Sequence, residues 1–204
     1  MVKKLNLLFV QQKLSESNIL IFSPREFQRI FDVTPFATSK FINQYVQKKF
    51  FLKLKNGLYC LALVEPNLFV IANKIYQPSY ISLETALAFY NIIPEKTYSI
   101  TSISSKDTRS FMAMDQDFSY NKIKKSLFTG YVLAEQNNEK FLIAEPEKAL
   151  MDYLYYAVRK KSEINGRINI SQLSKKKTKQ WQKIFNDSLI DNLISKLYDE
   201  SRAN

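Results

Sequence analysis

Residues 32–61 combine a sharply started amphipathic helix with a two-stranded hairpin, and this pairing limits the folds open to the chain. Thr34 and Pro35 are a helix start signal, because threonine caps a first turn and proline has no N–H group to leave unpaired there. At about 100° per residue, the helix has one apolar face and one polar face without acids. The apolar face holds Ala37, Phe41, Ile42, Tyr45 and Val46, and the polar face holds Ser39, Lys40, Asn43, Gln44 and Gln47.

The residues after this helix predict a basic hairpin. Between residues 51 and 62 apolar and basic side chains alternate, with Lys53 and Lys55 on one side. The Asn56-Gly57 pair favours a type I′ turn between the two strands. A basic hairpin directly behind an amide-rich helix is the arrangement of a winged helix-turn-helix.

Two more helices are predicted before this segment, which gives the number that the motif needs. The first covers Lys3–Leu14, with Leu5, Leu8, Phe9 and Val10 on its apolar stripe. The second opens at Ser23-Pro24, another cap followed by proline.

The positive charge of the chain is concentrated near the N-terminus. The 204 residues carry a formal net charge of +11. Residues 1–62 contain ten Lys or Arg against three Asp or Glu, so seven of the eleven net charges lie there. Such an excess is expected of a segment that neutralises DNA phosphates. A lysine-rich surface that only keeps the chain soluble is the other explanation.

A domain boundary is predicted at residues 62–66, where Glu65-Pro66-Asn67 resets the backbone after the hairpin. Residues 1–64 would form the DNA-binding domain and residues 65–204 a second domain. Five runs of the second domain are rich in β-branched and aromatic residues and are separated by polar turns. They are Thr97–Ser104, Ser110–Met114, Phe118–Ile123, Phe128–Leu133 and Lys140–Ile143. We expect an antiparallel sheet of four or five strands.

Helices are predicted on both sides of these strands. Residues 68–75 favour a short helix, and Ser82 is a suitable N-cap for a helix over residues 83–90. A strong helix over Glu147–Val158 follows the strands, and the last helix presents Leu189, Leu193 and Leu197 inward, before a fraying tail over residues 199–204. The fold class is therefore α+β: an N-terminal winged helix-turn-helix, then a mixed domain with an antiparallel sheet and C-terminal helices.

The candidate DNA contacts are polar or basic side chains of the helix-turn-helix and its wing. Asn and Gln pair bidentately with adenine, whereas Lys suits guanine or phosphate. Phe36 would touch a thymine methyl, or else make a hydrophobic contact at the helix start. The full set is Arg25, Arg29, Phe36, Ser39, Lys40, Asn43, Gln44, Gln47, Lys48, Lys53 and Lys55. A module of this shape that binds protein in place of DNA is the alternative.

A second candidate surface lies on the predicted sheet. Its basic residues are Lys106, Arg109, Lys122, Lys124 and Lys125, on neighbouring strands and turns. They would converge into one patch, although a solvated sheet face explains them equally well.

Catalytic signatures are scarce. The chain has three Gly, one Cys and no His, so phosphate-cradling loops, zinc sites and serine or cysteine triads lack their usual residues. Glu145, Glu147 and Asp152, with Lys148 nearby, would hold Mg²⁺ in a nuclease. Acids are also common at a helix N-terminus for electrostatic reasons alone. We expect no cofactor and no metal, and Cys60 is interpreted as a buried packing residue.

Targeting signals are not recognised in the sequence. The apolar runs are far shorter than the roughly 20 residues of a membrane span, and the basic N-terminus lacks a cleavage site. We expect a cytoplasmic protein without a membrane partner.

Four linked stretches resemble the AbiEi family of antitoxins and transcriptional regulators, which belong to bacterial type IV toxin–antitoxin and abortive-infection systems. They are PSYISLETALAFYNIIPEKTYSIT (residues 78–101), KDTRSF (106–111), FSYNKIKKSLFTGY (118–131) and IAEPEKALMDYLY (143–155). The similarity spans about residues 20–158 in the family's order, with the winged helix where the family has one.

This resemblance implies a repressor that binds inverted repeats in its own operon. It also implies a C-terminal domain that antagonises a nucleotidyltransferase toxin of the AbiEii type, without requiring a stable complex. The basic patch at Lys106 to Lys125 is our own hypothesis for the antitoxin surface. Two other functions stay open: a metal-dependent nuclease or nucleic-acid-processing enzyme, and an orphan regulator without a toxin.

Overall fold

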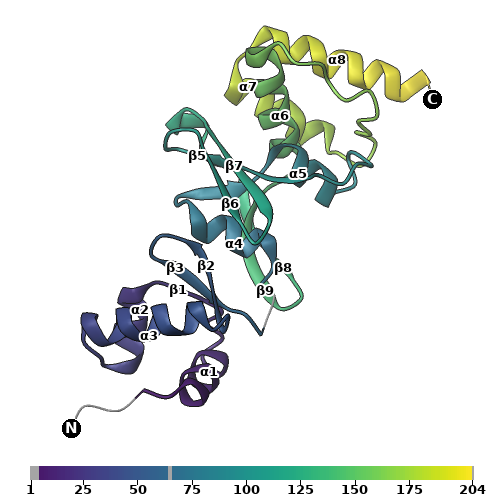
Figure 1. Cartoon of the computed structure of the whole chain (residues 1–204). Helices are drawn as coiled ribbons and strands as arrows, with labels where there is room; N and C mark the ends of the chain where they lie inside the picture. The colour runs from purple at the N-terminus through teal and green to yellow at the C-terminus, as the bar shows by residue number, and fades with distance from the viewer. Residues whose placement is uncertain (1–4, 64–65, 204) are drawn as a thin grey trace.

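The N-terminal unit consists of three helices and a small sheet. The computed structural model describes residues 5–63 and 66–203. The elements of this unit are α1 (Leu7–Glu16), β1 (Ile21–Phe22), α2 (Pro24–Phe31), α3 (Pro35–Gln47), β2 (Phe51–Lys55) and β3 (Leu58–Leu61). The strands form an antiparallel sheet in the order β1-β3-β2. The predicted pair of helices and hairpin are thus present (Figure 1).

Local capping explains where α2 and α3 begin. Ser23 forms a capping box: its hydroxyl accepts from the Glu26 N–H at 3.2 Å, and Glu26 Oε2 accepts from the Ser23 N–H at 2.7 Å. Asp32 ends α2 in the left-handed conformation, with φ of 51°. Thr34 then caps α3 through a bond from the Ala37 N–H, as predicted.

Aromatic rings fill the core of the N-terminal unit. Phe27 of α2 lies 5.7 Å from Phe41 of α3 between ring centroids, and Phe22 of β1 lies 5.3 Å from Phe51 of β2. Val10 and Leu14 of α1 close this core. The predicted stripe of α1 is wrong in part, because Leu8 and Phe9 are exposed, and the residues before Leu5 lie outside the described part of the chain.

The hairpin differs from the prediction at its turn. A type I′ turn needs positive φ at both central residues, but here only Gly57 has it, with φ of 75°. The register of β2 and β3 also shifts between Lys53 and Lys55. A local irregularity thus takes the place of the regular primed turn.

The side chains of the hairpin pack into two different hydrophobic cores. Phe51 and Leu61 belong to the core of the N-terminal unit. Leu54, Leu58 and Cys60 instead pack into the larger core of the remaining chain, which explains the burial predicted for Cys60. Burial raises the pKa of the Cys60 thiol to about 11. One face of the hairpin is therefore held against the second unit, defined here as residues 66–203.

A six-stranded sheet forms the centre of the second unit. Its strands are β4 (Ser79–Ile81), β5 (Ser99–Ser104), β6 (Arg109–Ala113), β7 (Gln116–Lys122), β8 (Tyr131–Gln136) and β9 (Glu139–Ala144). The spatial order is β6-β7-β5-β4-β9-β8. The predicted antiparallel sheet is confirmed only in part: the pairs β4–β5, β6–β7 and β8–β9 are antiparallel, but β5–β7 and β4–β9 are parallel, so the sheet is mixed. The three-residue strand β4 was not predicted, and Phe128 lies before β8 and not in it.

Some helices of this unit pack against the sheet, and the C-terminal ones pack against another helix and extend the molecule away from the N-terminal unit (Figure 1). The helices are α4 (Leu68–Ile75), α5 (Leu83–Phe89), the short 3₁₀ helix η1 (Lys125–Leu127), α6 (Pro146–Lys160), α7 (Lys175–Phe185) and α8 (Ser188–Ala203). Helix α8 continues to Ala203, so the predicted fraying from residue 199 is wrong. Ile190 and Ile194 of α8 are buried in the core of the second unit, whereas Leu189 is exposed.

The capping box gives a first testable prediction. Ser23→Ala is expected to destabilise the protein by about 1 kcal/mol, because the Glu26 N–H loses its partner. Burial alone would raise the pKa of Glu26, but the bonds with Ser23 and the nearby Lys74 and Arg29 hold it below its ordinary value of 4.5. This stabilisation is present above pH 4.5 and is lost as the pH falls. Urea denaturation at neutral and acidic pH measures both effects.

Ser39→Ala is the matched control, since Ser39 is exposed in the interior of α3 and caps no helix. An equal loss of stability in the two variants would contradict the capping argument.

Candidate nucleic-acid interface

Helix α3 presents a largely polar face without acids to solvent. Its five predicted groove residues are all exposed: Ser39, Lys40, Asn43, Gln44 and Gln47. Phe41 and Ile42 are buried on the opposite face, and Tyr45 and Val46 are half-buried. Phe36 is 79% exposed, so most of its side chain is available to a partner. Unlike these polar residues, Thr38 is buried, and its hydroxyl donates to the Thr34 carbonyl at 2.9 Å.

The basic residues after α3 lie in different surroundings. Lys48 is the C-cap residue of α3. Its ammonium lies 5.7 Å from the centre of the Tyr45 ring. Lys53 is exposed on β2. Lys55 instead lies over Phe111 of β6, at 5.8 Å from the ring centre. The structure therefore directs Lys55 toward the second unit, while Lys53 is open to a partner.

The two arginines of α2 lie one helical turn apart, and both are exposed. Arg25 and Arg29 border one surface recess with Gln28 and Asp32 and a second with Lys74 of α4, and Arg29 also faces α4 across a cleft. They lie next to the helix turn, but on the side of α2 that faces the second unit.

The second predicted patch is brought together at one end of the sheet. The register pairs Ser104 of β5 with Lys122 of β7, so the turns that follow β5 and β7 lie side by side. Lys106, Arg109, Lys122, Lys124 and Lys125 are all exposed there. Asp107 lies among them and accepts from Lys122 at 2.7 Å. This hydrogen bond and the attraction between the charges raise the pKa of Lys122 and lower that of Asp107.

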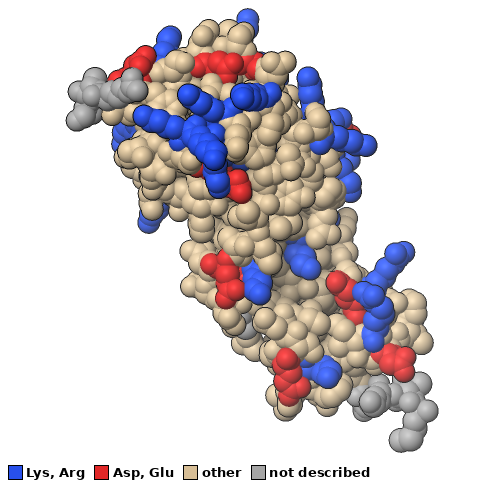
Figure 2. Space-filling view, turned by 180° about the vertical axis from the view of Figure 1, so that it is seen from behind, with Lys and Arg blue, Asp and Glu red and all other residues tan. Residues whose placement is uncertain are grey.

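Positive charge is not confined to the N-terminal unit. Residues 159–183 contain nine Lys or Arg and one acid, Glu163. Lys175, Lys176, Lys177 and Lys179 are exposed along the start of α7. Figure 2 shows Lys and Arg side chains gathered on the part of the molecule far from the N-terminal unit. Residues 1–62 are therefore not the only part of the chain with an excess of positive charge.

The three acids proposed for a metal do not form a site. Glu145 lies 3.8 Å from Lys177, and Glu147 is buried and accepts from the Ser174 N–H at 2.9 Å. Asp152 is fully buried in a different set of contacts. Within residues 5–63 and 66–203, no three His, Cys, Asp or Glu side chains are grouped so that they could hold a metal ion. The structure thus gives the nuclease hypothesis no metal centre.

Asp152 instead belongs to a buried polar network that sequence reasoning missed. Its carboxylate accepts from Ser82 at 2.8 Å, from Tyr80 at 3.1 Å and from Lys148. Lys148 also donates to the Tyr80 hydroxyl at 2.9 Å. The Ser82 hydroxyl is used here, so the predicted side-chain cap of α5 is absent. All four side chains are buried.

Aromatic rings cover this network. The Lys148 ammonium lies within 5.3 Å of the ring centres of Tyr80 and Phe185 and 5.7 Å from that of Trp181. Burial lowers the pKa of Lys148 and raises that of Asp152, although each charge favours the other. Because no solvent reaches the network, we interpret it as structural. The only sign of this network in the sequence is the pair of opposite charges, Lys148 and Asp152, which stand four residues apart in an otherwise apolar helix face.

Comparison with protein-family models and with curated protein sequences found no match to this chain. In the part of the chain that the structure describes, the helices are too short or too polar to span a membrane.

Proposed function

We propose that this protein is a DNA-binding transcriptional regulator whose α3 reads the major groove and whose second unit acts as an antitoxin. The observation that carries the first part is the exposed polar face of α3, formed by Ser39, Lys40, Asn43, Gln44 and Gln47. Three amides and a lysine without an acid match the donors and acceptors of base edges. The proposed target is operator DNA in the protein's own operon.

The elements around α3 support this proposal. Helix α2, a short left-handed turn and α3 are followed by a hairpin whose Lys53 is exposed. This is the order of elements in a winged helix-turn-helix, in which the second helix of the pair enters the groove and the wing contacts the backbone. Lys55 is a weaker candidate for a DNA contact than Lys53, since its ammonium lies over the Phe111 ring.

The antitoxin part rests on the resemblance of residues 78–155 to the AbiEi family. We propose that the five exposed cations between Lys106 and Lys125 form the acting surface, and that an AbiEii-type nucleotidyltransferase toxin is antagonised without an obligatory complex. Only one of these cations is within ion-pair distance of an acid among the described residues, namely Lys122 with Asp107. An exposed pair of this kind contributes little to stability. The patch can therefore be altered without unfolding the protein.

The groove proposal is tested by Asn43→Ala/Gln44→Ala/Gln47→Ala. Each lost bidentate contact is expected to remove about 1–3 kcal/mol of discrimination between bases. The preference for the operon's promoter fragment over scrambled DNA should therefore fall by at least tenfold. Binding to both DNAs should keep its dependence on salt, since the phosphate contacts remain. Fluorescence anisotropy with both fragments at two salt concentrations measures this.

The control variant is Gln180→Ala/Asn192→Ala, which removes exposed amides from α7 and α8. It should bind like the unmodified protein. If the α3 variant stays folded and keeps its full preference for the promoter fragment, α3 does not read the bases.

The antitoxin surface is tested by changing all five patch cations to Gln. In cells that express an AbiEii-type toxin, this variant is expected to lose protection. A control with Lys175, Lys176, Lys179, Lys183 and Lys196 changed to Gln removes the same charge from exposed positions of α7 and α8 and should still protect. Protection by a folded patch variant would contradict the assignment, and no protection by the unmodified protein would favour the orphan regulator.

A further inference from the structure

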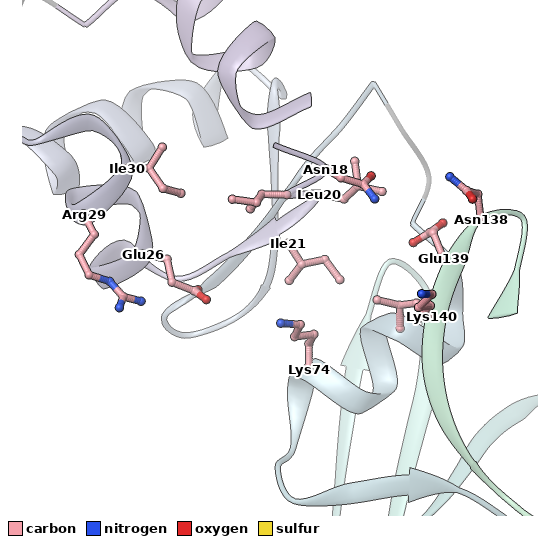
Figure 3. Close-up of a pocket in the computed structure, with 12 residues that line it drawn as sticks. Asn18, Leu20, Ile21, Glu26, Arg29, Ile30, Lys74, Asn138, Glu139 and Lys140 are labelled. Atoms are coloured by element: carbon pink, nitrogen blue, oxygen red, sulfur yellow. The ribbon is translucent and has the colours of Figure 1, made fainter. Parts of the chain in front are cut away.

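A cleft of about 750 Å³ lies between the N-terminal unit and the second unit. Helix α2 and the residues around β1 form one wall, and α4 with the start of β9 forms the other. Figure 3 shows Glu26 and Lys74 extending toward each other from opposite walls, with Arg29 on α2 and Lys140 on β9 at the border. Ile30 and Val70 add apolar surface.

The acids of this cleft are already engaged in hydrogen bonds, whereas two of its three cations form no ion pair among the described residues. Glu26 accepts from Ser23, and Glu139 accepts from the Asn67 N–H at 3.0 Å. Among the described residues, Arg29 and Lys74 make no ion pair within 4.0 Å, and Lys140 is 3.9 Å from Glu135. All three cations are exposed. The cleft can therefore offer three positive groups to an anion.

An aromatic recess of about 360 Å³ adjoins the cleft and shares Val70, Lys74 and Lys140 with it. Phe128 and Tyr131 line the recess, with ring centroids 5.5 Å apart. Tyr131 is 36% exposed, so its ring can accept a planar partner.

An unused hydroxyl lies beside these rings. Ser79 also lines the recess, is 4% exposed, and its Oγ has no hydrogen-bond partner among the described residues. Buried hydroxyl groups normally have a partner, so this one is an unsatisfied polar group among the residues that line the recess.

We propose that the cleft and its recess form a nucleotide-binding site. The phosphate lies against Lys74 and Lys140, which line both the cleft and the recess, where cationic donors suit its oxygens. The base stacks on the exposed part of Tyr131 and on Phe128. The two spaces together are large enough for a nucleoside monophosphate. This inference does not depend on DNA binding or on antitoxin activity.

Calorimetric titration of the full chain with AMP, GMP, CMP and UMP tests the site. At least one of them is expected to bind, and Lys74→Ala/Lys140→Ala should weaken that binding about tenfold or more. The control Lys13→Ala/Lys96→Ala removes two exposed lysines outside the cleft and should bind like the unmodified protein. Equal weakening in both variants would show general attraction to positive charge and would overturn the site.

The aromatic part is tested separately with Tyr131→Ala and with smaller probes. The nucleotide should bind more weakly to this variant, and inorganic phosphate and the corresponding nucleoside should each bind the unmodified protein more weakly than the nucleotide does. Phosphate that binds as tightly as the nucleotide would overturn the role of the recess. Absence of binding by all four nucleotides would overturn the proposal, whatever the outcome of the DNA and toxin experiments.

Discussion

Replacing Asp152 with alanine is expected to destabilise the protein by about 3–5 kcal/mol, because the substitution leaves Lys148 buried without its counter-ion. Both side chains have 0% exposure, so water cannot replace the lost carboxylate. Ser82 and Tyr80 lose the same acceptor. Urea denaturation, followed through the fluorescence of the chain's single Trp, measures the change.

A second pair of variants separates the missing counter-ion from the missing volume. Lys148→Met keeps most of the side-chain length, and Lys148→Met/Asp152→Leu removes both charges. We expect the double variant to be more stable than Asp152→Ala, since it has no unpaired buried charge. The coupling energy from the cycle of Lys148→Met, Asp152→Leu and the double variant gives the strength of the pair. If Asp152→Ala unfolds at the same urea concentration as the unmodified protein, the buried network is not a stabilising element.

The parts of the fold that the sequence predicted well are those determined by local signals. Helix α3 begins at the Thr34-Pro35 signal and shows the predicted polar face, because capping and the period of the helix depend only on neighbouring residues. The five long strands of the sheet were found for the same reason, through β-branched and aromatic runs. The candidate groove residues follow directly from the helical period.

Features that depend on distant parts of the chain were not predictable. Strand β4 has three residues, too few to show alternation, and its parallel pairing with β9 joins Ile81 to Ile143, two positions far apart in sequence. Lys148 and Asp152 have the spacing of an exposed ion pair on a helix surface, and only the cover of Trp181 and Phe185 makes them a buried one. The contact of Lys55 with Phe111 likewise needed the position of the hairpin against β6.

Gly130→Ala is expected to destabilise the protein by about 2–4 kcal/mol, from the sum of overpacking and backbone strain. A Cβ atom at this position would overlap the Cζ2 and Cη2 atoms of Trp181 and lie 3.1 Å from Cγ of Lys148. The φ angle of Gly130 is 75°, a value that side chains disfavour. Gly166→Ala is the control, because nothing lies within 4 Å of its Cβ position. That variant should stay within about 0.5 kcal/mol of the unmodified protein.

Gly130 and Asp152 act on the same buried network, so their substitutions should not be additive. Trp181 packs against Gly130 and also covers the Lys148 ammonium. When alanine at position 130 displaces the indole ring, water gains access to Lys148, and the loss of the Asp152 carboxylate then costs less. The variant Gly130→Ala/Asp152→Ala is therefore expected to lose less stability than the sum of the single changes, as residues that share a partner do. Full additivity in urea denaturation would show that Trp181 does not seal the network.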